Sequence, residues 1–139
     1  MTRGNTAGRL RSRPRFQLVQ TEQRTLRWRL LGGNNVSLGA GVADCARETE
    51  CLAAITVLKA HMELLSTDFR HISGGRWRWL LKLDGVSVAE ATHAYGRRIE
   101  AQRGLDRFRL AAMTASVEDI ETVVDWRQKY RRNSAGDSA

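Results

Sequence analysis

The chain has 139 residues, 42% of them apolar and 27% charged, and a formal net charge of +8 at pH 7. That length fits one ordinary domain or two very small ones, and the apolar content is enough for a small core. The sequence has no apolar run of about 18 residues, which excludes a membrane-spanning helix, and its basic N-terminus lacks the apolar segment of a secretion signal. Its two cysteines lie outside any CxxC pattern, so we expect a reduced, cytoplasmic protein.

The net charge is concentrated at the two ends of the chain. Residues 1–15 contain five arginines and no acid, residues 127–139 carry a net charge of +3, and residues 16–126 are neutral overall. Basic arms on a neutral body are a common means of holding polyanions. Arginine supplies 20 of the 23 basic residues, a bias that a GC-rich genome also produces, so composition alone is a competing explanation.

The first half of the chain predicts three strands followed by a helix. Apolar and polar residues alternate weakly near its start and clearly in LRWRLL, as in a half-buried strand. GGNN at 32–35 indicates a turn, and ARETECLAAITVLKAH spaces apolar residues along one helical stripe. The expected elements are strands over 16–21, 26–31 and 36–40 and a helix within 46–61. The stripe consists of Leu52 and Ile55, with Val57 and Leu58 as further candidates.

The second half repeats this plan about 50 residues later. LRWRL at 26–30 aligns with WRWLL at 77–81, VSL at 36–38 aligns with VSV at 86–88, and DG at 84–85 indicates the second turn. Such self-similarity at a fixed period is the signature of an internal repeat. The equivalent elements are strands over 69–73, 76–83 and 86–91 and a helix within 96–112, whose stripe is Ile99, Leu105 and Phe108.

The alternation assigns a face to each residue type in the two Trp/Arg strands. Trp28 and Trp79 share a face with leucines, whereas Arg27 and Arg78 point to the opposite side. One helix per half can cover one side of three strands, so we expect the Trp/Leu face beneath the helices and the Arg face outward. A stacking surface for nucleic-acid bases would instead need the aromatic rings on the open face.

These motifs resemble the YegP-like family, a group of bacterial and archaeal domains of unknown function that are often found as tandem pairs. The second half carries most of the matching residues, which are Phe69, Gly75, the run RWRWLLKLDG, Val88, Ala89, Tyr95, Ala101, Gly104, Leu105, Phe108 and VEDI at 117–120. The first half is more divergent, with Cys45 where the family has tyrosine and Ala54 where it has glycine. The resemblance covers roughly residues 15–121.

The resemblance implies an α+β fold of two β(3)-α-β repeats forming one antiparallel sheet, with exchanged C-terminal strands and the helices on one face. Pairing would supply the buried area that a unit of about 50 residues lacks alone. We expect the last strand at about 116–121, although Ser116-x-x-Asp119 is also typical of a capping box ahead of a helix containing Ile120, Val123 and Val124. The expected organisation is a basic flexible arm over 1–14, repeat one over 15–66, repeat two over 67–121, and a short helix or basic tail over 122–139 that carries Trp126 and Tyr130.

The sequence contains no recognisable catalytic or metal-binding pattern. Asp44 and Glu48 oppose a thiolate at Cys45, and GAG at 39–41 is not followed by the Lys-Ser/Thr pair of a phosphate loop. We therefore expect no enzyme, no catalytic residue, no cofactor and no metal. The histidines, which lack zinc spacing to one another or to a cysteine, are His61, His71 and His93.

The charge pattern favours a small non-enzymatic binding module. We expect an electrostatic accessory protein that binds nucleic acid without sequence specificity. The alternative is a protein-interaction or self-association module with solubilising basic tails. We expect no membrane contact, and either a monomeric pseudo-dimer or a homodimer. The candidate polyanion-binding residues are Arg9, Arg11, Arg13, Arg27, Arg29, Arg76, Arg78, Arg131 and Arg132.

Overall fold

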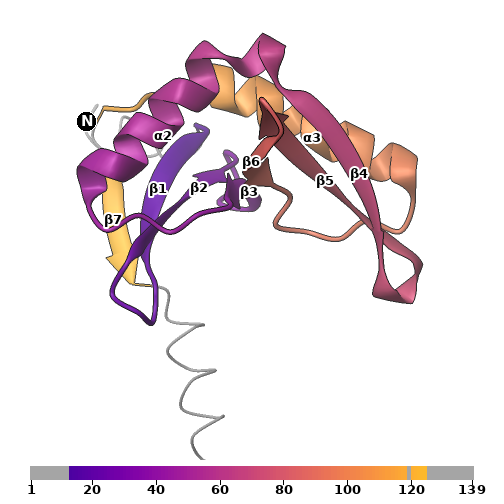
Figure 1. Ribbon diagram of the computed structural model, residues 1–139, viewed down its shortest axis with the longest axis horizontal. Coiled ribbons are helices and arrows are strands. Elements are labelled where there is room, and N and C mark those ends of the chain that lie inside the picture. Colours follow the sequence, from indigo (N-terminus) through magenta and orange to yellow (C-terminus); the bar gives the residue numbers. More distant parts are fainter. Residues whose placement is uncertain (1–12, 119, 125–139) are drawn as a thin grey trace, which may run out of the picture.

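The computed structural model describes residues 13–118 and 120–124 of the chain. These residues form one seven-stranded sheet, and two α-helices run along one of its faces (Figure 1). The elements are β1 (Arg15–Gln20), β2 (Leu26–Leu31), β3 (Ser37–Gly41), α2 (Glu48–Ala60), η1 (Met62–Leu64), β4 (Ser66–Ile72), η2 (Ser73–Gly75), β5 (Arg76–Leu83), β6 (Val86–Glu90), α3 (Arg98–Thr114) and β7 (Glu121–Val124). Neither α-helix of this described part is long and apolar enough to cross a membrane.

The strands follow the order β4-β5-β6-β3-β2-β1-β7 across the sheet. The central strands β3 and β6 are antiparallel, with Ala40 opposite Glu90, and β7 runs parallel to β1, with Glu121 opposite Gln17. The prediction of a fully antiparallel sheet is therefore wrong at this edge. A helical connection carries the chain back across a sheet, so a strand that follows it can enter parallel to its new neighbour.

The Trp/Arg strands and the turns that follow them lie where the sequence predicts, but the last strand lies later than expected. β2 and β5 occupy the predicted residues. Strand β7 begins at Glu121 rather than near 116, because Ser116 Oγ accepts a hydrogen bond from the Glu118 N–H at 2.9 Å and the chain turns there. The helix considered as an alternative for this segment does not form. Trp126 and Tyr130 lie outside the described residues.

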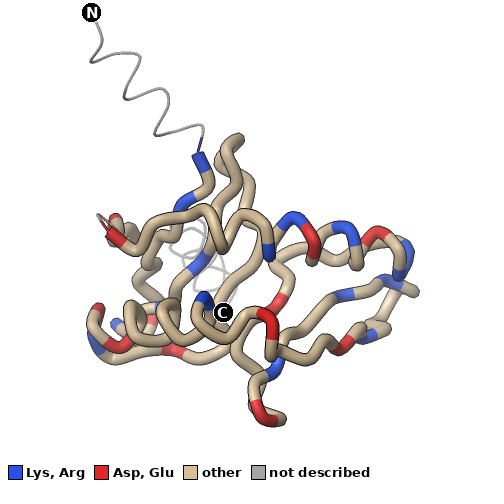
Figure 2. The backbone as a smooth tube through the Cα atoms, turned by 90° about the horizontal axis from the view of Figure 1, so that it is seen from above, with Lys and Arg blue, Asp and Glu red and all other residues tan. Residues whose placement is uncertain are grey.

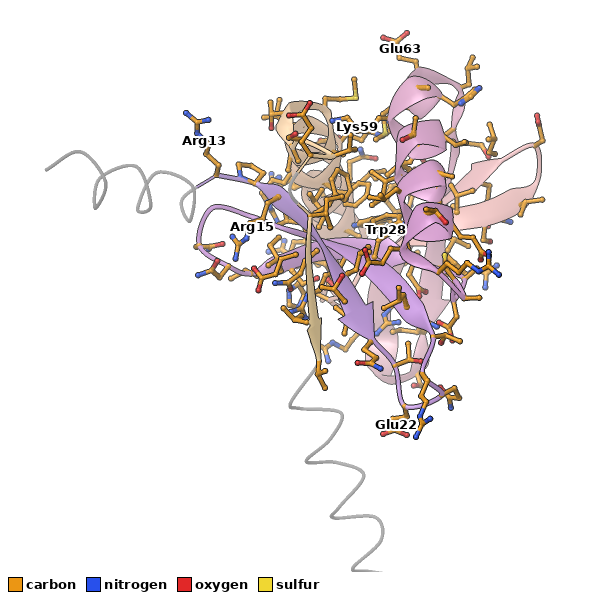
Figure 3. The ribbon with its side chains drawn as sticks, turned by 90° about the vertical axis from the view of Figure 1, so that its left-hand side faces the viewer. Arg13, Arg15, Glu22, Trp28, Lys59 and Glu63 are labelled. Atoms are coloured by element: carbon orange, nitrogen blue, oxygen red, sulfur yellow. The ribbon has the colours of Figure 1, made fainter. Side chains whose placement is uncertain are left out.

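The core lies between the helices and the sheet, as the alternation predicted. Trp79 and Leu30 are fully buried, and the Phe108 ring of α3 packs on the Trp79 ring with their centroids 4.7 Å apart. Figure 3 shows Trp28 beneath α2. Its ring lies 5.7 Å from Phe16 in an edge-on arrangement. The tryptophans therefore supply the large apolar area that so short a chain needs.

Each helix buries a stripe that differs in part from the predicted one. Ile55, Leu105 and Phe108 are buried as expected, but Ile99 is 51% exposed and Val57 is 42% exposed. Ala101 and Cys51 take their places in the core. A helix turns by about 200° over two residues, so Ile99 must point away from the sheet once Ala101 points toward it.

Both halves of the chain contain the same irregularity in their second and third strands. A β-bulge interrupts the β2–β3 register between Leu30 and Leu31, and another interrupts the β5–β6 register between Leu81 and Lys82. Further along, β2 makes an isolated bridge to Cys45 and β5 makes one to Tyr95. A bulge increases the local twist of a strand pair. In Figure 1 the two hairpins β1–β2 and β4–β5 descend on opposite sides below the helices.

Candidate anion-binding surface

The side of the sheet away from the helices carries most of its polar side chains. Successive strand residues point to opposite faces, so the neighbours of the buried tryptophans and leucines face this open side. Figure 2 shows basic and acidic residues interspersed along the chain rather than gathered in a large field of one sign. One line of residues facing each other crosses the whole sheet and consists of Glu121, Gln17, Arg29, Ala40, Glu90, Leu80 and Asp68.

Two of the predicted polyanion-binding arginines are engaged within the protein. Arg27 Nη2 lies 2.6 Å from Asp44 Oδ1, and its Nε donates a hydrogen bond to the same oxygen at 2.9 Å. Arg29 Nε donates a hydrogen bond to Gln17 Oε1 at 2.8 Å, which satisfies the only polar side chain that is buried in the described part. These contacts give both arginines a structural role in the first half of the sheet.

The β4–β5 hairpin presents arginines that have no side-chain partner within the described part of the chain. Arg70 lies directly opposite Arg78, and Arg76 is the next residue on the same face of β5. All three are exposed, and we call them the hairpin arginines. Within residues 13–118 and 120–124, neither Arg70 nor Arg78 forms an ion pair. Like charges directly opposite on neighbouring strands are destabilising, and a bound anion would relieve that repulsion.

The turn of this hairpin fixes the register that places the two arginines opposite each other. Ser73–Gly75 connects β4 to β5, and Ile72 pairs with Arg76 as the closing pair. Gly74 and Gly75 have φ angles of 80° and 70°, a backbone region that only glycine adopts at little cost. Arg76 Nη2 donates a hydrogen bond to the Ala94 carbonyl oxygen at 3.1 Å, which orients its guanidinium.

The helix-side face of the same hairpin carries aromatic contacts. The rings of His71 and Trp77 stack with centroids 4.6 Å apart and planes inclined by 26°. The Arg98 guanidinium, at the start of α3, lies 4.5 Å from the centre of the Phe69 ring. This cation–π contact places another basic group beside the hairpin.

The remaining predicted residues lie at or beyond the ends of the described chain. Arg13 is exposed and extends away from the sheet (Figure 3). Arg70 was not predicted, because sequence reasoning assigned β4 without pairing it to β5. The Gly-Gly turn could have revealed it, since a hairpin centred on Gly74 pairs position 70 with position 78. Outside the described residues lie Arg9, Arg11, Arg131 and Arg132.

A small hollow on the open face lies over the first half of the sheet. It has a volume of about 290 Å³, and its lining includes Arg27, Arg29 and Ser37 from β2 and β3 and Asp44 from the loop after β3. Its one carboxylate, Asp44, is already paired with Arg27. This lining supplies neither a free base nor a nucleophile with an activating partner.

The environment of Cys51 disfavours its thiolate, the reactive form of a cysteine. Burial is the largest of several causes that raise the pKa of the Cys51 thiol to about 12, followed by its contact with Cys45 and by the nearby acids. Both cysteines are free thiols. No group of three or more His, Cys, Asp or Glu side chains in the described part of the chain is arranged to hold a metal ion.

Known proteins share the architecture. No family model matches the sequence, and no curated protein sequence does either. The solution NMR structure of yegP from E. coli, a protein of unknown function, superposes with a TM-score of 0.59 and 15% identity over 81% of this chain and 93% of that one. A UPF0339 protein from Shewanella oneidensis superposes with a TM-score of 0.63 and 10% identity over 79% of this chain and 90% of its own. The chain has the YegP-like fold. At these identities the likeness concerns the fold alone.

Proposed function

We propose that the protein is a small non-enzymatic module that binds polyanions, and nucleic acid in particular, through the hairpin arginines. The pair formed by Arg70 and Arg78 carries this proposal, because the two arginines lie directly opposite each other on neighbouring strands and neither forms an ion pair within the described residues. Repulsion between these two arginines lowers the stability of the hairpin. A phosphate bound between them would reduce the repulsion and restore that stability.

The chemistry of arginine favours phosphate as the ligand. A guanidinium donates two parallel hydrogen bonds to a phosphate, and the three exposed hairpin arginines offer such bonds from one face of the sheet. The contacts address the backbone and not base edges, so binding is expected without sequence preference. The basic ends of the chain add charge of the same sign to the bound state.

The proposal includes an internal duplication with one exchanged strand. The matching bulges, the matching bridges to Cys45 and Tyr95, and the central pairing of Ala40 with Glu90 support two copies related by a local twofold axis. Strand β7 follows the second copy and pairs with the first strand of the first copy. The free cysteines support an assignment to the reducing cytoplasm.

The test is binding of fluorescently labelled DNA and RNA of arbitrary sequence to the full chain, measured by anisotropy across a salt series. The double variant Arg76→Gln/Arg78→Gln removes two hairpin arginines. We expect weaker binding at low salt and a slope of log K against log [salt] that is smaller by about 2, one unit for each lost phosphate contact. Arg103→Gln/Arg107→Gln is the matched control, because both arginines are exposed on α3.

Other outcomes distinguish the alternatives. Equal losses in the hairpin and control variants would overturn the assignment to the hairpin. A loss confined to Arg9→Gln/Arg11→Gln/Arg131→Gln/Arg132→Gln would place binding in the chain ends instead. No binding by the unmodified chain at low salt would reject nucleic acid and leave a protein partner as the function to pursue.

A further inference from the structure

The two edges of the sheet are covered differently. In the first half, β1 pairs with β2 on one side and with β7 on the other. In the second half, β4 pairs with β5 alone, and no other strand of the described residues lies on its outer side. From this edge and its charges we infer that β4 pairs antiparallel with β4 of a second copy of the chain.

Hydrogen bonds on β5 show which β4 residues offer their backbone to a partner. The backbone N–H and carbonyl of Trp77 both form hydrogen bonds with Tyr95, at 2.7 and 2.8 Å. These backbone groups of Trp77 are therefore directed away from β4. The alternate residues of β5, including Arg78, must therefore direct their backbone N–H and carbonyl groups toward β4. Asp68 and Arg70 pair with such residues of β5, so their own backbone N–H and carbonyl groups are directed toward β5. The residues that direct their N–H and carbonyl groups outward are Thr67, Phe69 and His71.

Only one antiparallel register satisfies both the backbone and the charges. If Phe69 pairs with its own copy, Thr67 pairs with the partner's His71, and every outward-facing residue exchanges hydrogen bonds. Asp68 then lies opposite the partner's Arg70 in a non-hydrogen-bonded pair, where side chains approach most closely. A shift of the partner by two residues in either direction would place Asp68 opposite the partner's Asp68, or Arg70 opposite the partner's Arg70.

This pairing supplies the acidic partner that Arg70 lacks among the described residues. The partner's Asp68 would lie beside Arg70 and reduce the repulsion between Arg70 and Arg78. Asp68 Oδ2 already lies 3.1 Å from Lys82 Nζ, so the acid is held on the correct face of the strand. Charged residues on an edge strand usually prevent pairing with other copies. Here the order Asp-Phe-Arg makes the edge complementary to itself under a twofold axis.

Dimerisation and polyanion binding would each reduce the repulsion between Arg70 and Arg78, but the dimer does not rest on the proposed function. The polyanion test changes Arg76 and Arg78 and leaves Asp68 and Arg70 in place, so the two ideas can fail independently. An interface made of one strand from each copy is small, and so we expect a reversible dimer that forms with increasing protein concentration and weakens with salt.

The test uses two charge-reversal variants of the full chain, Asp68→Arg and Arg70→Asp, and sedimentation velocity over about two decades of protein concentration. Each variant alone places like charges opposite each other, so we expect both to be monomeric where the unmodified chain dimerises. Mixed in equal amounts, the two variants place an arginine opposite an aspartate at both contacts, so we expect a heterodimer. Glu22→Arg and Arg103→Asp change the net charge equally at exposed positions outside β4 and should leave dimerisation unchanged.

The mixture also controls for folding, because an unfolded variant could not restore the dimer. Far-UV circular dichroism of each variant gives a second check. An unmodified chain that stays monomeric at every concentration would overturn the inference. So would dimers that persist in both single variants, or variants that are folded yet fail to associate when mixed.

Discussion

The Tyr95 ring lies against the backbone of Gly104 on α3. A β-carbon added at Gly104 would lie 2.5 Å from Tyr95 Cζ, well inside contact distance, so the glycine makes room for the phenol. Tyr95 is held in place by its two backbone hydrogen bonds to Trp77. The same positions in the first half are Cys45 and Ala54, where a smaller side chain on the loop accompanies a larger one on the helix.

The first prediction is that Gly104→Ala destabilises the protein by about 1–3 kcal/mol, because the methyl group overpacks the Tyr95 contact. The intrinsic gain of alanine over glycine in a helix, about 1 kcal/mol, offsets part of the cost. In Tyr95→Cys/Gly104→Ala, which copies the pair of the first half, we expect the loss to be smaller than the sum of the two single losses. Urea unfolding of the four proteins of this cycle measures the coupling, and strictly additive losses would refute the compensation.

The fold could be predicted wherever a strict period was present. The alternation of Trp with Arg located β2 and β5. The repeat at about 50 residues then indicated that the same strands and helix occur in both halves. Strand β7 was misplaced because its partner β1 lies about 100 residues earlier, and pairing at that distance leaves no local pattern. The helix stripes were wrong at Ile99 because a small residue, Ala101, faces the core, and alanine gives no hydrophobic signal of its own.

The candidate site could be predicted only in part for a related reason. Composition identified arginine as the important residue type, and the alternation placed Arg76 and Arg78 on the open face. Which arginines are free depends on contacts between strands. Arg27 meets Asp44 from the loop after β3, and Arg70 meets Arg78 across a turn. Neither relationship can be read from one strand alone.

The second prediction concerns Gly39, in the GAG sequence of β3. A β-carbon there would lie 2.6 Å from the Phe108 ring and 2.7 Å from Trp79 Cη2. Both rings are fully buried and have little room to move. We expect Gly39→Ala to cost about 1–3 kcal/mol of unfolding free energy. Gly96→Ala is the control, since its nearest neighbour would be Glu100 Oε1 at 3.6 Å. Equal stability of the two variants would contradict close packing at Gly39.

The third prediction is that removing one hairpin arginine stabilises the monomer. Arg78→Gln relieves the cross-strand repulsion with Arg70, and we expect a gain of about 0.2–1 kcal/mol at low salt. The gain should shrink at high salt, because counterions screen exposed charges. Arg103→Gln removes an equal charge from α3 and should give no comparable gain. Urea unfolding of dilute protein at two salt concentrations measures both effects. A loss of stability in Arg78→Gln would show that the two guanidiniums do not repel each other.

The fourth prediction is a loss of stability at alkaline pH that depends on Cys51. Burial raises the pKa of its thiol from 9.0 to about 12 in the folded protein, so the unfolded chain releases this proton at a lower pH than the folded one does. The contribution of the protonated Cys51 thiol to the free energy of unfolding is therefore present in full below pH 9 and is lost as the pH rises from there toward 12. The loss amounts to about 1.4 kcal/mol for each pH unit in this window.

The check is urea unfolding between neutral pH and about pH 10.5 for the unmodified chain, Cys51→Ala and Cys45→Ala. Cys51→Ala lacks the titrating thiol, so its stability should fall less steeply with pH, even though the smaller side chain lowers its stability at neutral pH. Cys45→Ala should retain most of the slope, because burial and not the Cys45 contact is the largest cause of the shift. Parallel pH profiles for the unmodified chain and Cys51→Ala would show that the buried thiol ionises as readily in the folded protein as in the unfolded one.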